Sequence, residues 1–277
     1  IEEHGKVVFV TDAMYDDVLA PLIQWKIEKG LTTEVVYAAD FGNDYDAIKD
    51  FLADQYFNEG LTHVILAGDE DQVAATLVTN GGGTGYCDPC YGYVEGDDHY
   101  PEFFVGRLLV HDVDEMETLV ERTLEYEKNP FLGEEWFNIG VGIGSNEGAG
   151  IGDNGESDWQ HLNAIKDKLI DYDFQEVWEL YDGSQAGNSP TGGETADEAG
   201  NPNANDMIEL ENKGLSFINY TGHGYHGGIA SSGFDINAIG QTTNNGMYGF
   251  FVPVACCVGD FDEGEGSGDC FGEVWIK

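Results

Sequence analysis

Short apolar runs rich in β-branched residues alternate along the chain with segments of helical periodicity. The first run covers residues 6–11, and a helical pattern over 18–29 follows it and ends at Gly30. A strand pattern over 33–37 and a helical pattern over 44–56 repeat the alternation. Strands that alternate with helices predict a parallel sheet covered by helices.

The same alternation continues to the end of the chain. Strands are expected at 62–67, 102–107, 137–144, 175–180, 215–220 and 250–255, and helices at 113–128 and 159–172. Residues 129–133 (NPFLG) break the helical pattern before it restarts, which indicates a boundary near residue 130. We therefore expect two side-by-side α/β subdomains, residues 1–130 and 131–277. The polar, glycine-rich segment 182–205 is long enough for a functional loop.

The charge of the chain is strongly one-sided. Lys and Arg total 11 against 53 Asp and Glu, which gives a formal net charge of -42. Such a field repels nucleic-acid phosphates and anionic membranes, so neither is an expected partner. It favours cationic substrates and divalent cations, although a solvated acidic coat for a salty or calcium-rich environment is the favoured explanation of the composition.

The sequence predicts neither a membrane-spanning segment nor a signal peptide. No apolar run reaches the roughly 18 to 20 residues that a bilayer span requires, and the N-terminus lacks a basic-then-apolar signal peptide. The chain is therefore interpreted as mature and soluble. Its expected location is secreted or at the cell surface.

Two of the most apolar strands in the second half lead into reactive side chains. Residues 221–224 (TGHG) follow one strand, so two glycines flank His223 where the chain leaves the sheet. The strand over 250–255 leads directly to Cys256. Open α/β sheets place their active sites at the carboxyl ends of their strands, and a thiol needs a nearby base to act as a nucleophile. The pattern predicts a cysteine–histidine dyad.

Each member of this dyad has a rival nearby. Cys257 is an alternative nucleophile, and His226 is an alternative base. Because successive side chains of a strand point to opposite faces, only one of the two adjacent cysteines is expected to face His223.

The segments around the dyad resemble the gingipain peptidases, which share their fold with caspases and clostripain. The matching segments are 219–224 (NYTGHG), 254–256 (VAC), 259–261 (GDF), 270–273 (CFGE), 25–26 (WK), 29–31 (KGL), 33–35 (TEV), 98–100 (DHY), 106–107 (GR) and 152–158 (GDNGESD). They occur in the same order over nearly the whole chain. The resemblance implies a caspase-like, three-layer α/β sandwich with a mostly parallel sheet.

The resemblance also assigns roles to residues. It makes Cys256 the nucleophile and His223 the acid and base, and it leaves Cys257 as a small buried apolar residue. The backbone N–H groups of Gly224 and Cys256 are implied as the oxyanion hole. Glu147 matches an acid that orients the histidine ring, with an ordinary solvated glutamate as the alternative.

Asp158 matches the gingipain acid at the base of the specificity pocket, where it would pair with a guanidinium or ammonium group. Its alternative role is to cap the helix that begins near Trp159. The expected function is a secreted cysteine endopeptidase that cuts after Arg or Lys through an acyl-enzyme, with no cofactor for the chemistry. The alternatives are a sortase-like transpeptidase of the same fold and a catalytically silent, calcium-binding surface or filament protein.

Metal ligands and further cysteines are also predicted. The acidic turns that contain Asp69, Asp97 and Asp153 offer hard oxygen ligands suited to a structural Ca²⁺ ion, although none has the full EF-hand spacing. Among the 5 cysteines, Cys87 and Cys90 form a single Cys-x-x-Cys pair. Without a second pair, this spacing favours a local disulfide over a zinc site.

The last residues suggest a processed chain. Residues 270–276 (CFGEVWI) precede Lys277, and their apolar side chains are expected to be exposed unless more polypeptide packs on them. The resemblance implies further strands and helices. We therefore expect a proteolytic cut after Lys277 and a second chain that completes the fold, with the simple limit of the sequence as the alternative.

Overall fold

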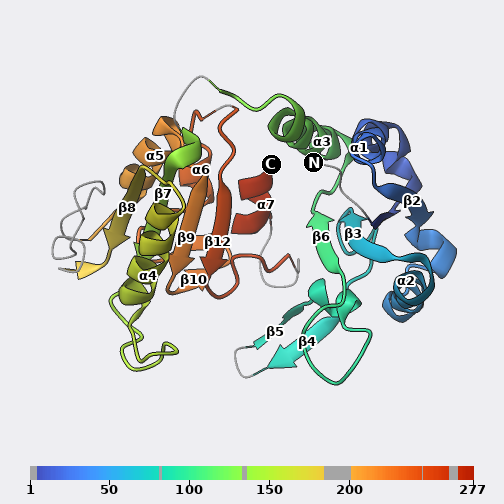
Figure 1. Cartoon of the computed structure of the whole chain (residues 1–277), viewed down its shortest axis with the longest axis horizontal. Helices are drawn as coiled ribbons and strands as arrows, with labels where there is room; N and C mark the ends of the chain where they lie inside the picture. The colour runs from blue at the N-terminus through green and yellow to red at the C-terminus, as the bar shows by residue number, and fades with distance from the viewer. Residues whose placement is uncertain (1–4, 81–82, 133–135, 184–200, 245, 262–267) are drawn as a thin grey trace. The chain divides into compact units, whose positions relative to one another are not determined.

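The chain folds into two compact units, each with its own sheet (Figure 1). The computed structural model describes residues 5–80, 83–132, 136–183, 201–244, 246–261 and 268–277. The units comprise residues 1–124 and 125–276, so the division falls within helix α3 (Val113–Lys128) rather than just after it. Most of the segment 182–205 lies outside the described residues.

Unit 1 contains a four-stranded parallel sheet in the order β2-β1-β3-β6. Its elements are β1 (Lys6–Thr11), α1 (Asp16–Glu28), β2 (Thr32–Tyr37), α2 (Tyr45–Glu59), β3 (Leu61–Ala67), the hairpin β4 (Leu77–Asn80) and β5 (Gly83–Tyr86), β6 (Phe104–Leu108) and α3. Every residue of β1 is buried, as expected for a central strand covered on both faces. On one face Val8 and Val10 pack with Ile48 and Leu52 of α2.

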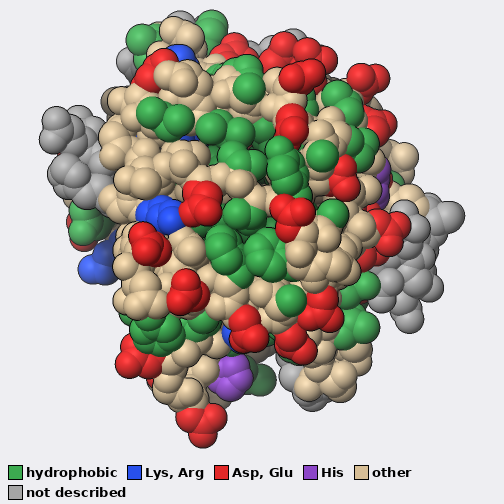
Figure 2. Space-filling view, turned by 90° about the vertical axis from the view of Figure 1, so that its right-hand side faces the viewer, with side chains coloured by type: hydrophobic (Ala, Val, Ile, Leu, Met, Phe, Trp, Pro, Cys, Tyr) green, Lys and Arg blue, Asp and Glu red, His purple; other side chains and the backbone are tan. Residues whose placement is uncertain are grey.

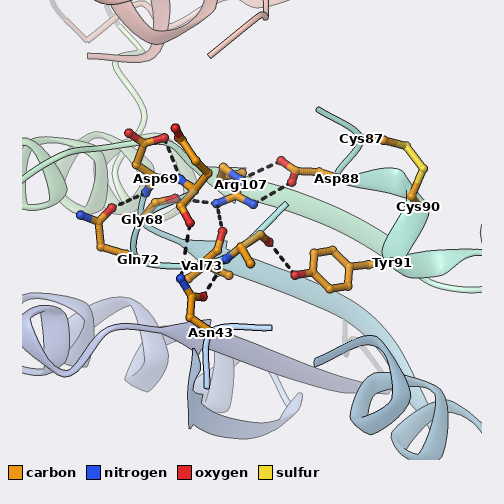
Figure 3. A network of polar contacts seen from close by, with 12 residues as sticks. Asn43, Gly68, Asp69, Gln72, Val73, Cys87, Asp88, Cys90, Tyr91 and Arg107 are labelled. Atoms are coloured by element: carbon orange, nitrogen blue, oxygen red, sulfur yellow. Dashed lines mark hydrogen bonds and ion pairs between the residues drawn. A yellow bond between two sulfur atoms is a disulfide. The ribbon is translucent and has the colours of Figure 1, made fainter. Parts of the chain in front are cut away.

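One buried arginine holds the turn that follows β3 (Figure 3). The Arg107 guanidinium, only 4% exposed, donates two hydrogen bonds to the Asp88 carboxylate at 2.7 and 2.8 Å. Its Nη1 also donates to the carbonyls of Gly68 and Val73, both at 2.9 Å. A planar fork of donors suits this bidentate contact. Arg107 therefore ties the carboxyl end of β3 to the loop after β5.

The same loop is closed by a disulfide. Cys87 and Cys90 are bonded, which confirms the local disulfide expected from their spacing (Figure 3). The buried Tyr91 hydroxyl donates to the Ala74 carbonyl at 2.6 Å, and the Asn43 amide bonds the neighbouring main chain. The turn is thus fixed by several independent contacts.

The acidic composition is visible on the surface. Figure 2 shows Asp and Glu side chains spread over one face of the molecule, with few Lys or Arg among them. No helix among the described residues is long and apolar enough to cross a bilayer. A surface of this kind repels anions and attracts cations.

Unit 2 repeats the strand arrangement of unit 1. Its sheet has the order β12-β9-β7-β8, and all three strand pairs are parallel. Its elements are β7 (Ile139–Gly144), α4 (Asp158–Asp171), β8 (Glu176–Tyr181), α5 (Ala204–Lys213), β9 (Phe217–Thr221), β10 (Gly224–Tyr225), β11 (Gly228–Ile229), α6 (Ile236–Ile239), β12 (Phe250–Val254) and α7 (Phe271–Ile276). In each unit the first strand lies between the second and the third.

This strand order determines which face each helix covers. The β7-α4-β8 and β8-α5-β9 connections run in opposite directions across the sheet, so right-handed crossovers place α4 and α5 on opposite faces. Accordingly, Leu162 of α4 packs with Tyr181, whereas Met207 of α5 belongs to the larger core with Ile218.

The sequence IGVGIG of β7 explains the close packing of α4. Ile139, Val141 and Ile143 point into the larger core. The alternate positions are glycines, as the two-residue period of a strand allows. A Cβ atom at Gly144 would lie 2.9 Å from Leu162 Cδ1 and 3.1 Å from the Trp159 Cα. The bare backbone therefore lets the N-terminus of α4 approach the carboxyl end of the sheet.

The C-terminal residues are less exposed than the sequence suggests. Cys270 and Phe271 are buried, and the Phe271 ring packs with Phe234 and Phe251 at centroid distances of 6.2 and 5.6 Å. Trp275 joins the same cluster, 5.1 Å from Phe251. Val274, Trp275 and Ile276 are half-buried. The expected exposure is therefore not observed for Cys270 and Phe271, whereas the cut after Lys277 and the second chain stay predictions.

The predicted α/β class with mostly parallel sheets is confirmed. Helix α3 begins and ends at the predicted residues, and the central strands differ from prediction by a few residues at their ends. The two-residue strands β10 and β11 were not anticipated, because so short a pairing leaves no periodicity in the sequence.

Unit 2 also buries a carboxyl group for which the described residues supply no charged partner. Glu211 of α5 is fully buried, and its Oε2 accepts one hydrogen bond from Asn244 at 3.1 Å. Its Oε1 has no hydrogen-bond partner among the described residues. Burial raises the pKa of Glu211 to about 8. The folded protein therefore keeps this group protonated at pH values where the unfolded chain ionises it.

The burial of Glu211 predicts that Glu211→Gln increases the free energy of unfolding, and that the increase depends on pH. Because the folded-state pKa is raised, the contribution of Glu211 to stability is complete below about pH 4.5 and is lost as the pH rises to about 8. The variant should therefore match the wild type near pH 4.5 and exceed its free energy of unfolding by on the order of 3 kcal/mol near pH 8. Urea unfolding across this range measures it, with the exposed Glu209→Gln on the same helix as control. A constant difference between the two proteins at all pH values would contradict the assignment.

Candidate active site

The pairing of β9 with β12 brings His223 and Cys256 to one edge of the sheet. These strands are parallel neighbours, and Thr221 at the end of β9 is the partner of Val254 at the end of β12. His223 and Cys256 each lie two residues beyond this last pair. Because neighbouring strands are about 4.8 Å apart, the backbones at the two positions are adjacent.

The turn that carries His223 is packed against its surroundings. The buried Tyr220 hydroxyl donates to the His223 carbonyl at 2.5 Å, and the Ala230 N–H donates to the same oxygen at 2.9 Å. A Cβ atom at Gly222 would lie 2.6 Å from the Tyr220 hydroxyl, and one at Gly224 would lie 2.6 Å from the Cys256 carbonyl oxygen. Both flanking glycines are therefore required by close approaches.

The His223 ring is held from the next strand. Its Nε2 lies 3.0 Å from Oε2 of Glu147, in the loop that follows β7. Strand β7 connects first to β8 on one side and pairs with β9 on the other, so this contact spans the topological switch point where open α/β sheets bind ligands. The side chains are 73% and 65% exposed and thus accessible to a substrate. With Nε2 engaged, Nδ1 is the ring nitrogen left for a second partner.

The three thiols of unit 2 differ in accessibility. Cys256 and Cys257 are exposed, whereas Cys270 is buried. Burial raises the pKa of the Cys270 thiol to about 12, which excludes it as a thiolate nucleophile near neutral pH. The expected burial of Cys257 is wrong. Strand β12 ends at Val254, and Cys257 adopts a left-handed conformation (φ 58°), so strand alternation does not extend to the adjacent cysteines.

Asp158 lies at the start of α4 but is not its cap. The N-cap is Ser157, whose N–H donates to the Gln160 side chain at 2.9 Å. The Asp158 carboxylate instead accepts a hydrogen bond from the Ser145 hydroxyl at 2.5 Å. The alternative role of Asp158 as the helix cap is therefore not the one observed.

A pocket of about 240 Å³ opens beside this carboxylate. Its lining residues are Ile151, Gly152, Asp153, Glu156, Ser157, Asp158, His161 and Thr221. The backbone N–H of Glu156 itself and that of Asn154, at 2.7 Å, lower the pKa of the Glu156 carboxyl group. Carboxylates on several sides make the pocket suited to a cationic side chain.

The acids expected to bind metal have different environments. Asp69 is buried and lies 2.9 Å from the His111 ring. Asp97 is exposed, and Asp153 is an exposed residue at the pocket. None of the three belongs to a group of three metal-ligating side chains within the described part of the chain. Calcium binding therefore stays a prediction.

Two residues of the site escaped the sequence reasoning. Ser145 and Tyr220 are both buried, and their hydroxyl groups bond Asp158 and the His223 main chain respectively. Tyr220 belongs to an apolar strand pattern, and Ser145 follows a glycine-rich one. Neither pattern shows what the hydroxyl will contact. Ser145 bonds a residue 13 positions later, and Tyr220 bonds the main chain of the turn that folds back over it.

Comparison with known proteins supports a peptidase fold. Gingipain R2 of Porphyromonas gingivalis is 32% identical over 280 residues, which cover all of this chain and 35% of that protein. Lys-gingipain of the same species is 25% identical and covers 98% of this chain, which matches 15% of that protein. The crystal structure of the Arg-specific cysteine proteinase gingipain R superimposes with a TM-score of 0.85 at 31% identity.

These relatives are longer than the chain described. It spans about a third of the length of gingipain R2 and 59% of the crystallised gingipain R chain, although that structure covers 100% of this one. The family model for peptidase family C25 matches residues 1–277. The gingipain resemblance of the sequence is thereby confirmed, and the chain belongs to peptidase family C25.

Proposed function

We propose that this chain carries the catalytic centre of a cysteine endopeptidase that cleaves after arginine or lysine. The observation that carries the proposal is the shared strand edge, at which His223, held by Glu147, lies one strand away from an exposed Cys256. Membership of peptidase family C25 and the similarity to an Arg-specific cysteine proteinase support it.

The proposed reaction begins with transfer of the Cys256 proton to His223. The thiolate attacks the scissile carbonyl carbon, and His223 then gives the proton to the leaving amine. Water resolves the acyl-enzyme with the same imidazole as general base. The contact from Glu147 to Nε2 at 3.0 Å supports this role, since it holds the ring through one nitrogen and leaves Nδ1 for the thiol.

We assign the stabilisation of the negatively charged oxygen of the tetrahedral intermediate to the backbone N–H groups of Gly224 and Cys256. This assignment is supported by the close approach of the two segments, with the Cys256 carbonyl oxygen 2.6 Å from a Cβ position at Gly224. Any side chain at position 224 would separate them. Fixed backbone donors stabilise the charge of a tetrahedral intermediate without reorganising during the reaction.

The substrate's basic side chain is assigned to the pocket that Asp158 lines. A carboxylate held by Ser145 would form a charge-assisted pair with a guanidinium or ammonium group. Of the two basic residues, we propose arginine as the preferred residue before the scissile bond, because this chain is more identical to gingipain R2 than to Lys-gingipain.

A location outside the cytosol is proposed as well. It is supported by the disulfide between Cys87 and Cys90, since disulfides persist mainly in oxidising compartments. Structural calcium remains part of this proposal, with the acidic turns at Asp97 and Asp153 as its exposed oxygen donors.

The pocket assignment predicts the kinetics of Asp158→Asn. Losing the charge that faces the substrate should reduce kcat/KM on arginyl substrates by about 100-fold or more while leaving the melting temperature within about 2 °C. Hydrolysis of matched arginyl, lysyl and neutral peptides measures this, with Asp167→Asn on the exposed face of α4 as control. An equal loss on neutral peptides would show that Asp158 serves the fold instead.

The dyad assignment predicts different outcomes for the adjacent cysteines. Cys256→Ala should abolish hydrolysis, whereas Cys257→Ala should retain most of it. The reason is that Cys256, like His223, lies two residues beyond the last strand pair, whereas Cys257 lies three residues beyond it. Both variants remove one exposed thiol, so each serves as the other's control. Loss of activity in Cys257→Ala alone would reverse the assignment.

Calcium binding predicts a cation-specific stabilisation. For an affinity typical of extracellular sites, with Kd about 10⁻⁴ to 10⁻³ M, about 5 mM Ca²⁺ should add roughly 1–2 kcal/mol to the free energy of unfolding. Thermal unfolding in Ca²⁺, in Mg²⁺ and in chelator measures it. The same melting temperature in Ca²⁺ and Mg²⁺ would contradict a specific calcium site, because general screening of the acidic surface would then explain the stabilisation.

A further inference from the structure

Ser145 connects the pocket to the dyad through one buried hydroxyl. It is the first residue after β7 and only 4% exposed. Its Oγ donates to Asp158 Oδ2 at 2.5 Å and accepts the Glu147 N–H at 3.1 Å. Since a serine hydroxyl has one proton, both contacts are satisfied only when that proton goes to the carboxylate and a lone pair takes the N–H.

Further backbone bonds close this arrangement into a ring. The Asp158 N–H donates to the Glu147 carbonyl at 3.1 Å, so the two acidic residues are joined both directly and through Ser145. The Ser145 N–H donates to the carbonyl of Thr221, the last residue of β9, at 3.1 Å. The hydroxyl is thereby fixed relative to the strand that leads to His223.

The Asp158 carboxylate is confined on its other side by the main chain. A Cβ atom at Gly148 would lie 2.4 Å from Asp158 Oδ1, so only a glycine fits beside it. One carboxylate oxygen is thus taken by Ser145 and the other lies against a bare backbone.

From these contacts we infer that Ser145 is a positioning residue for substrate recognition. It holds the Asp158 carboxylate in place at the pocket, and the same hydroxyl fixes the main chain from which Glu147 reaches His223. The inference rests on the proposed roles of Asp158 and His223 and names a determinant of the specificity of that site. A purely structural role for Ser145 would predict something different, because here the effect of Ser145 on substrate binding depends on the charge at residue 158.

The test begins with Ser145→Ala and a matched serine. Ser216 also donates a partly buried hydrogen bond, to the Phe137 carbonyl at 2.9 Å, but at the opposite end of the sheet. Ser145→Ala should raise both KM for an arginyl peptide and the inhibition constant of benzamidine about tenfold or more, because the carboxylate that binds the cation is no longer held in place. Ser216→Ala should leave these constants within about twofold.

A double-mutant cycle decides whether Ser145 acts through Asp158. In an Asp158→Asn background, Ser145→Ala should change benzamidine binding by less than about twofold, because the charge it serves is gone. An equal loss in both backgrounds would overturn the inference. Ser145→Cys retains a similar volume with a weak donor, so it should also weaken binding, and wild-type binding in this folded variant would equally contradict the role of the hydroxyl.

The outcomes separate this inference from the proposed function. If Asp158→Asn weakens benzamidine binding and Ser145→Ala does not, only the role of Ser145 fails. If Asp158→Asn leaves both benzamidine binding and the preference for arginine unchanged, the pocket assignment fails, and the inference fails with it.

Discussion

The register between β9 and β12 is the constraint on which the catalytic geometry depends. Thr221 pairs with Val254, so the two loops leave the sheet at the same level and each presents its reactive residue two positions later. A slip of one residue in a strand pair would turn every side chain of that strand to the other face. The register is protected by burial, since Ile218 and Tyr220 of β9 lie in the core of unit 2.

The two units use the same strand order for different purposes. In unit 2 the switch point between β7 and β9 carries the Glu147–His223 contact and is open to solvent. In unit 1 the turn that follows β3 at the corresponding edge is held by Arg107 and contains the buried Asp69. A buried bidentate ion pair is expensive to disrupt by removing one partner. The same topology thus supports an open site in one unit and a closed, rigid edge in the other.

Much of the fold was readable because its signals are local. The strands and helices follow from periodicity, and the helix α3 was predicted at both ends. The edge that carries His223 and Cys256 followed from the rule that parallel strands end together. The roles of Glu147 and Asp158 came from family resemblance, because nothing local marks a loop carboxylate as functional. The burial of Cys257 was mispredicted because the strand ends before it, and the contacts of Ser145 depend on a loop conformation that no sequence period encodes.

Covalent labelling tests the central claim, which is that the sheet edge couples the Cys256 thiol to the His223 imidazole. A peptidyl-arginyl chloromethyl ketone alkylates a thiol that a neighbouring base has activated, and peptide mass spectrometry locates the adduct. The predicted result is a single adduct on Cys256, formed much more slowly in His223→Ala and in the presence of benzamidine. An adduct on Cys257, or labelling of Cys256 at the same rate without the His223 imidazole, would contradict it.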